Sequence, residues 1–415
     1  MTGLDDDDVA AVDAIVAPSD AALAGQYPGE EASRQPVHTV YVPAGDGLPP
    51  DLLQQWGSAA LEAIAQHAAT PSEMATATGL DVAGVSTVWD SVVAKLEREP
   101  VEDLRVDFED GYGVRPDAEE DADSAAAVQV LMQAASPFCG IRIKSFEAAT
   151  RRRALRTLDL VVSGLVARGG LPDGWVVTLP KVSAVEQVLG MVEACARLEA
   201  VHGLEPGRLR FEVQVETPQA VLGADGGATV ARIVHAGSGR VSGLHYGTYD
   251  YSAALGIPAG QQSLEHPAAD HAKAVMQLAA AGTGVRLSDG STNVLPVGSR
   301  DDVHAAWRLH ARLVRRSLER GYYQGWDLHP AQLPTRYAAT YLFFRAGLPS
   351  ASDRLRRYVS RQGGGVLDEP ATARALASFV LRGVHCGAVT DSEADALTGL
   401  DPAGLTALAR PRPAP

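Results

Sequence analysis

Short apolar runs alternate along the chain with longer stretches that have helical periodicity. Eight of these runs end in polar or turn-forming residues, and they occupy residues 37–45, 103–113, 139–147, 174–182, 209–218, 241–250, 284–291 and 325–332. Helical stretches lie between them, for example at residues 148–167, 184–200, 268–281 and 301–319. A repeated strand and helix rhythm is typical of a parallel sheet with helices packed outside it.

Eight such units favour an α/β fold closed into a (β/α)8 TIM barrel over an open, doubly wound sheet. Polar residues end nearly every predicted strand, among them Asp107, Glu216, Asp250, Asp289 and Asp327. In a barrel the carboxyl ends of all strands meet at one mouth, where catalytic groups lie. We therefore expect these side chains to converge there.

Three segments fall outside this rhythm. Residues 1–35 form an acidic, alanine-rich N-terminal extension, and residues 46–100 form a helical insertion after the first strand. The insertion lies within the predicted catalytic barrel domain, residues 36–335. Residues 336–415 are predicted to form a C-terminal helical arm or lid that ends in a proline-rich tail.

Composition narrows the class of protein. The chain has 415 residues, 46% of them hydrophobic, and a formal net charge of −15, which disfavours a nucleic acid as partner. Its three cysteines are too few and too widely spaced for a disulfide framework or a zinc cluster. The first residues are acidic, and no apolar stretch approaches the roughly 20 residues that a membrane span requires. We predict a cytoplasmic protein without a membrane partner.

The strongest chemical signal is a pair of acids that end successive predicted strands. Glu216 lies in QVETP and Asp250 lies in YGTYDYSAALG. Two carboxylates without nearby cysteine or clustered histidine make a hard oxygen site that suits Mg²⁺ or Mn²⁺. The alternative is that both are solvated strand-end or helix-capping acids.

Basic residues end two other strands. Arg142 and Lys144 alternate in GIRIKSFE, and both are candidate substrate-binding residues, as are Lys181 and Asp107. The planar fork of Arg142 would point into the mouth and grip a substrate carboxylate. The alternative is a buried structural ion pair with Asp107 or Glu109. Lys181 in TLPKV is predicted to assist substrate binding electrostatically, whereas a Schiff-base role would need a lowered pKa.

Further candidates lie near these strand ends. In DFEDGYG, Asp107 and Glu109 share one face and are expected to orient Arg142, Lys181 or metal-bound water, while Asp110 opens the turn. His329 in DLHPAQ is a second-tier candidate for proton transfer, since a lone histidine is more often structural.

Taken in chain order, these motifs resemble the family of citrate lyase beta subunits, malyl-CoA and citramalyl-CoA lyases and HpcH/HpaI aldolases. The resemblance covers residues 37–335 and is carried by VHTVYVPAG, DFEDGYG, IRIK, LPKV, QVETPQAV, YGTYDYSAALG and DLHPAQL. It implies that Glu216 and Asp250 are metal ligands and that Arg142 holds the substrate carboxylate or the developing enolate. The VLDEPATARA stretch resembles the family's C-terminal arm, which makes Asp368 a candidate acid or base, although helix capping would explain that residue equally well.

The resemblance also implies the activity and the assembly. It points to a Mg²⁺- or Mn²⁺-dependent carbon–carbon lyase or aldolase that acts through the enolate of a small carboxylate such as pyruvate or oxaloacetate. A coenzyme A thioester of malyl or citramalyl type is an alternative substrate, and a homotrimer or homohexamer is expected. Lys144 departs from the family pattern, which has asparagine there. Two other functions stay open: a phosphoenolpyruvate-related phosphotransferase or hydrolase, and a non-catalytic barrel subunit.

Overall fold

Eight parallel strands form one sheet in this computed structural model, which describes residues 3–31, 33–45, 47–360 and 369–410. The strands are His38–Pro43 (β1), Asp103–Asp107 (β2), Phe138–Arg142 (β3), Trp175–Leu179 (β4), Phe211–Val215 (β5), Val241–Tyr246 (β6), Arg286–Ser288 (β7) and Gly325–Asp327 (β8). Their order is β7-β6-β5-β4-β3-β2-β1-β8, and a bridge between Ser288 and Gln324 joins the two edges. The predicted (β/α)8 TIM barrel is therefore confirmed.

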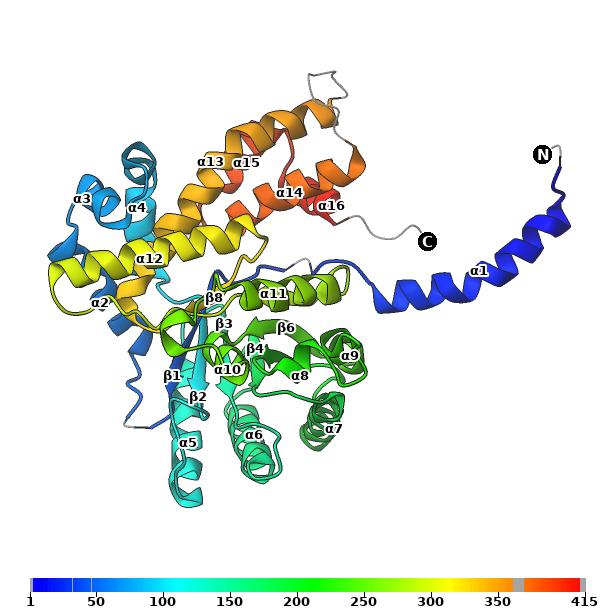
Figure 1. Cartoon of the computed structure of the whole chain (residues 1–415), viewed down its shortest axis with the longest axis horizontal. Helices are drawn as coiled ribbons and strands as arrows, with labels where there is room; N and C mark the ends of the chain where they lie inside the picture. Colours follow the sequence, from blue (N-terminus) through cyan, green and yellow to red (C-terminus); the bar gives the residue numbers. More distant parts are fainter. Residues whose placement is uncertain (1–2, 32, 46, 361–368, 411–415) are drawn as a thin grey trace.

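Helices connect the strands and cover the outside of the barrel (Figure 1). Before β2 they are Asp6–Gln26 (α1), Leu52–His67 (α2), Pro71–Thr78 (α3) and Val82–Arg98 (α4). Between β2 and β8 they are Asp117–Gln133 (α5), Arg151–Val166 (α6), Val185–His202 (α7), Pro218–Val221 (α8), Thr229–Ala236 (α9), Thr248–Ala254 (α10), Ala259–Gln261 (η1), Pro267–Ala280 (α11) and Arg300–Glu319 (α12). After β8 they are Pro330–Gln332 (η2), Leu333–Val359 (α13), Pro370–His385 (α14), Asp391–Thr398 (α15) and Pro402–Ala409 (α16).

The inside of the barrel is unusually polar. Successive side chains of a strand point to opposite faces, so Leu104 and Val106 of β2 pack outward against helices while Arg105 points inward. Arg105 reaches across the barrel to Glu212 of β5, with 3.1 Å between its Nε and the carboxylate. Apolar burial therefore lies mainly between the strands and the helices, and the interior holds charged groups that must pair with one another.

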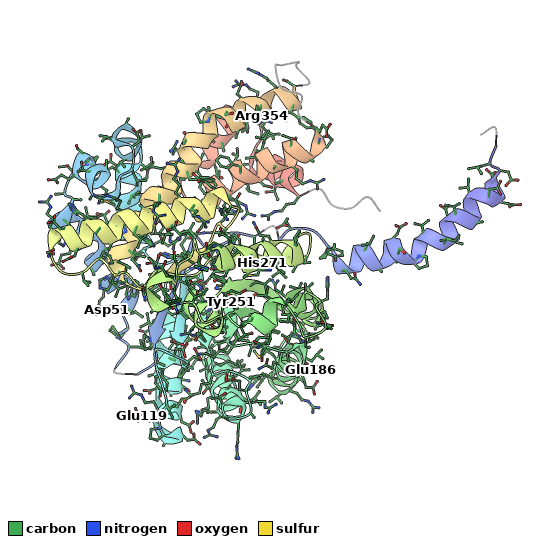
Figure 2. The ribbon with its side chains drawn as sticks, in the orientation of Figure 1. Asp51, Glu119, Glu186, Tyr251, His271 and Arg354 are labelled. Carbon is green, nitrogen blue, oxygen red and sulfur yellow. The ribbon has the colours of Figure 1, made fainter. Side chains whose placement is uncertain are left out.

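The two ends of the chain differ in how they pack. Helix α1 has no buried residue, and Figures 1 and 2 show it extending away from the barrel with its side chains clear of the other elements. Helix α14 instead packs against α13 and α16. Helices α2, α3 and α4 occupy the predicted insertion after β1. The boundaries proposed for the extension, the barrel domain and the arm stay predictions.

None of the described helices combines the length and the apolar character that crossing a membrane would require.

Candidate metal and substrate site

Glu216 and Asp250 lie at the carboxyl ends of neighbouring strands. Glu216 directly follows β5, and Asp250 lies in the first turn of α10, which follows β6. Lys181, just beyond β4, contacts both acids: its backbone N–H donates to Glu216 Oε1 at 2.7 Å, and its Nζ lies 3.8 Å from Asp250 Oδ2. The fold thus brings the two candidate metal ligands to the same part of the mouth.

The environment of Glu216 disfavours its charged form. Its residue surface is only 3% exposed, and this burial raises the pKa of the carboxyl to about 8. Asp250 and Glu109 add negative charge that raises the pKa further, while Arg142 opposes the rise. A nearby cation of higher charge would reverse this balance and favour the ionised carboxylate.

Arg142 forms a buried ion pair, which is the structural alternative that the sequence analysis left open. Its Nε and Nη2 donate to the two carboxylate oxygens of Asp107, both at 2.6 Å. Its guanidinium carbon lies 4.8 Å from the ring centre of Tyr41. Nη1 is held less tightly, at 3.4 Å from Gln214 Oε1 and 3.5 Å from Glu109 Oε2. Nη1 is therefore the part of Arg142 that has capacity for a substrate oxygen.

Glu109, Asp110 and Lys181 form a second charged group beside this pair. Lys181 Nζ donates to Glu109 Oε1 and to Asp110 Oδ1, each at 2.6 Å. Burial raises the pKa of Glu109 to about 7, against the opposing effect of Arg142 and Lys181. Burial alone would lower the pKa of Lys181, but the bonds to Asp110 and Glu109 raise it above its ordinary value. A lysine held in this way stays charged, which fits an electrostatic role.

Two sequence candidates, Lys144 and Asp368, do not belong to this group of described side chains. Lys144 Nζ donates to the carbonyl oxygens of Phe108 at 2.7 Å and Gly113 at 3.0 Å, and pairs with Glu120 of α5 at 3.2 Å. Its amine is therefore occupied by the β2–α5 connection. Asp368 lies outside the described residues.

His329 caps the short helix η2. Its Nδ1 accepts from the backbone N–H of Ala331 at 3.1 Å, and burial lowers the pKa of its ring below the ordinary value. This geometry matches the structural alternative, and a role in proton transfer stays a prediction.

The expectation that every strand-end acid faces the mouth was wrong for two residues. Asp289 accepts hydrogen bonds from Lys273 of α11 at 3.0 Å and from Ser317 of α12 at 2.6 Å. Asp327 pairs with His310 of α12 at 3.0 Å and with Arg336 of α13 at 2.9 Å. Both carboxylates satisfy buried cations on the surrounding helices, which holds them outside the barrel.

Sequence reasoning missed several residues that shape the site. Gln214 contacts Arg142 from β5, and Tyr41 and Trp326 place their rings 4.6 Å apart beneath the guanidinium. Strand alternation could have found Gln214, because it lies two positions before Glu216 and so shares its face. Gly247 was also missed: a Cβ there would lie 2.4 Å from Glu216 Cβ, so only glycine leaves room for the carboxylate.

The donor set fits a hard divalent cation. Negative charge exceeds positive charge at the mouth, where two cations, Arg142 and Lys181, face five carboxylates: Asp107, Glu109, Asp110, Glu216 and Asp250. Across the described ranges, no group of three or more His, Cys, Asp or Glu side chains is arranged to hold a metal ion. Glu216 and Asp250 would thus supply two oxygen ligands, and water and substrate oxygens would complete the shell that Mg²⁺ prefers.

Comparisons with known proteins agree on the fold. No curated protein matches the sequence. A citrate lyase from Burkholderia xenovorans LB400 superimposes with a TM-score of 0.58 at 19% identity, over 88% of this chain and 99% of that one. Malate synthase from Haloferax volcanii superimposes with a TM-score of 0.52 at 15% identity, over 93% of this chain and 99% of that one. A magnesium and glyoxylate complex of the Haloferax enzyme has a TM-score of 0.50 at 14% identity, over 92% of this chain and 99% of that one.

Identities this low establish a shared barrel and leave the chemistry to be argued from the site. At the level of sequence, one family model matches residues 16–413. The chain therefore belongs to the family described as a domain of unknown function, DUF6986.

Proposed function

We propose that this chain is a divalent-metal-dependent carbon–carbon lyase or aldolase that acts on a small keto acid or acyl-CoA through an enolate beside a carboxylate. The observation that carries the proposal is the excess of carboxylate at the mouth, centred on Glu216 and Asp250 and lying next to Arg142. The superimposed structures support it, because one is a citrate lyase and another is a malate synthase with magnesium and glyoxylate. In this proposal the substrate is a small carboxylate such as pyruvate or oxaloacetate.

In this proposal Glu216 and Asp250 hold Mg²⁺ or Mn²⁺. The bound ion supplies positive charge that stabilises an enolate, which is otherwise too basic to form at neutral pH. Lys181 fixes Glu216 through its backbone N–H. Gly247 keeps the space beside that carboxylate open.

Arg142 and its partners bind and orient the substrate. Asp107 holds the guanidinium on its Nε and Nη2 side, so the orientation is set before substrate arrives. Nη1 then faces the Glu109 side of the mouth, where it can donate to a substrate carboxylate. Lys181 adds a second positive charge at the same edge.

Glu109 is the described residue best placed to move a proton. It is 9% exposed, and its Oε1 accepts from Lys181. A carboxyl whose pKa is about 7 can hold or release a proton near neutral pH, which a general acid or base requires. Asp368 and His329 stay the alternative candidates for this step. A coenzyme A thioester substrate and a trimeric or hexameric assembly in the cytoplasm are further parts of the proposal.

Pyruvate release tests the proposal directly. The purified protein is assayed with 4-hydroxy-2-keto acids and with malyl- and citramalyl-CoA, in Mg²⁺, in Mn²⁺ and in excess EDTA. We expect turnover with metal, none in EDTA, and a loss of at least 100-fold in Glu216→Gln. Glu205→Gln is the matched control, because Glu205 is an exposed glutamate remote from the mouth. Turnover that survives both EDTA and Glu216→Gln would refute the proposal, and nucleotide-dependent turnover would favour a phosphotransferase.

A further inference from the structure

A cavity lies at the end of the barrel opposite Glu216. It has a volume of about 390 Å³ and is lined by Val37 just before β1, by Arg286 at the start of β7 and by residues of α14. The strands are parallel, so the cavity lies at their amino ends, and in Figure 1 the arrowheads of β1 and β2 point away from α14 and α16. The volume falls within the range of roughly 300–1,000 Å³ typical of small-molecule sites.

Basic side chains from distant segments meet in this cavity. Arg286 comes from β7, Arg382 and His385 come from α14, and Arg410 directly follows α16. Two acids, Glu30 and Glu31, share the lining. Glu31 lies 3.4 Å from Arg210, which precedes β5 and is not part of the lining, and this contact offsets part of the negative charge of Glu31. The lining is thus rich in cations although the whole chain carries a net charge of −15.

The polar contacts of these arginines are made to neutral groups. Arg382 Nη1 donates to Gln35 Oε1 at 2.9 Å, and its guanidinium carbon lies 4.2 Å from the ring centre of Tyr323. Arg286 Nη2 donates to the hydroxyl of Ser33 at 2.7 Å and to its carbonyl oxygen at 2.8 Å. Arg410 Nη1 is buried and has no hydrogen-bond partner among the described residues. A buried guanidinium without a matching anion is costly, and Glu30 and Glu31 offset only part of the positive charge of the three arginines, so a further negative group would stabilise the cavity.

The electrostatics of the cavity agree with that conclusion. Burial lowers the pKa of Arg286 to about 10, and Arg210, Arg382 and Arg410 lower it further against the effect of Glu31. Burial, together with the surrounding arginines, also lowers the pKa of His385 to about 4. The cations therefore repel one another in the ligand-free protein.

We propose that this cavity binds a small oxyanion with at least two negative charges, either a phosphate ester or a polycarboxylate. The planar guanidinium forks of Arg286, Arg382 and Arg410 match the oxygen pairs of both chemistries. Tyr323, Phe344 and Phe379 form an apolar wall that suits the carbon part of such a ligand. The site is separate from the mouth and does not depend on the proposed function.

Ligand binding there would tie the C-terminal helices to the barrel. Arg382 and Arg410 belong to the C-terminal region and Arg286 belongs to the sheet, so one bound anion contacts both parts. The anion also removes the repulsion among the arginines. A ligand that binds only the folded protein stabilises it by RT ln(1 + L/Kd), where L is the free ligand concentration, so the melting temperature rises with the logarithm of that concentration once it exceeds Kd.

Calorimetry and thermal unfolding of the full chain test this site. The probes are pyrophosphate for the phosphate class, citrate for the polycarboxylate class and acetate as a monoanion, all at constant ionic strength. We expect one pyrophosphate or one citrate to bind per chain and to raise the melting temperature, with no response to acetate. Whichever of the two binds more tightly identifies the ligand class. No binding of either at 10 mM, a concentration on the order of 100 times a Kd of about 0.1 mM, would overturn the proposal.

Paired variants locate the binding. Arg382→Gln and Arg410→Gln should each weaken binding at least tenfold, whereas Arg197→Gln, which changes an exposed arginine on α7, should leave it unchanged. The ligand-free melting temperature of Arg410→Gln should not fall, because the change relieves repulsion, so a loss of binding would not reflect unfolding. Glu216→Gln should also keep binding. Equal loss in Arg197→Gln, or full binding in both cavity variants, would refute the assignment.

Discussion

Two glutamates on one strand show opposite electrostatic behaviour. Glu212 lies within β5 and Glu216 directly follows it, so strand alternation turns both into the barrel. Both are buried, with exposures of 4% and 3%. Burial alone would raise both pKa values, yet Arg105 and His245 lower the pKa of Glu212 well below its ordinary range, while the pKa of Glu216 rises to about 8.

The difference lies in what surrounds each carboxylate. Glu212 accepts from Arg105 Nε at 3.1 Å, from Thr178 Oγ1 at 2.6 Å and from His245 Nε2 at 2.9 Å. Glu216 accepts from the backbone N–H of Lys181, and Asp250 and Glu109 lie near it. A buried charge that is fully paired inside the fold is structural, whereas one that is opposed by like charges marks a place where an external cation binds. We therefore assign Glu212 a structural role and propose a metal-binding role for Glu216, although both are glutamates on the same side of one strand.

The largest expected effect is on the paired glutamate. Glu212→Gln removes one partner of Arg105 and leaves a buried guanidinium with less counter-charge. We expect it to lower the free energy of unfolding by about 3–5 kcal/mol, the usual cost of breaking a buried ion pair. Urea unfolding followed by circular dichroism measures this. A loss below 1 kcal/mol would mean that Asp103 alone neutralises Arg105, and the comparison would fail.

The matching change at the mouth should have the opposite sign. Glu216→Gln replaces a carboxyl that folding holds largely in its neutral form at pH 7, so the metal-free protein should gain stability on the order of 2 kcal/mol. It should also lose Mg²⁺ binding by at least 100-fold in calorimetry. A metal-free variant less stable than the wild type would show that Glu216 is a structural residue after all.

The pH dependence of stability separates the two glutamates in one experiment. Glu216 has a folded pKa of about 8, above its ordinary 4.5, so its contribution is fully present below about pH 4.5 and is lost as the pH rises through 8. Glu212 has a lowered folded pKa, so its contribution is present above that ordinary value and is lost as the pH falls through the folded pKa. The melting temperature of the metal-free protein should therefore fall on both sides of a maximum near pH 4.5, the ordinary pKa that the two carboxyls share.

Variants and metal identify each limb of that profile. Glu216→Gln should flatten the alkaline limb, and Glu212→Gln should flatten the acidic one. Saturating Mg²⁺ should remove the alkaline decline, because the ion replaces the proton on Glu216. An alkaline limb that is the same in Glu216→Gln and in wild type would assign it to other groups.

The sequence predicted the barrel and much of the mouth because both follow from local patterns. Short apolar runs bounded by polar or turn-forming residues predicted all eight strands, and the position at a strand end is enough to put Glu216, Asp250, Arg142 and Lys181 at one rim. The direction in which a strand-end side chain turns is not a local property. Asp327 turns outward because Arg336 on a distant helix needs a counter-charge, and His310 on another helix bonds to the same carboxylate.

The cavity at the amino ends of the strands could not be predicted from local sequence patterns either. Its arginines are far apart in the sequence and meet only after α14 packs against α13. Nothing around Arg286 or Arg410 distinguishes them from ordinary surface arginines until the fold removes their solvent. The difference between Glu212 and Glu216 likewise depends on the charged groups around each carboxylate, and these come together only in the folded chain.

The smallest expected effect is that of Lys144→Met, which tests whether a fully paired side chain also serves the site. Lys144 lies at the same strand end as Arg142, but its amine bonds to Phe108, Gly113 and Glu120. It is therefore fully paired within the fold, as Glu212 is, and differs in this from Glu216. We expect Lys144→Met to leave KM within about twofold of wild type, since changes of less than about 0.4 kcal/mol in substrate binding fall in that range, and to reduce stability instead. Steady-state kinetics and urea unfolding measure both. Lys181→Met is the contrasting variant, since its amine lies in the mouth, and it should raise KM clearly. A larger KM effect in Lys144→Met than in Lys181→Met would restore Lys144 as a substrate-binding residue and would show that a fully bonded side chain can still serve the site.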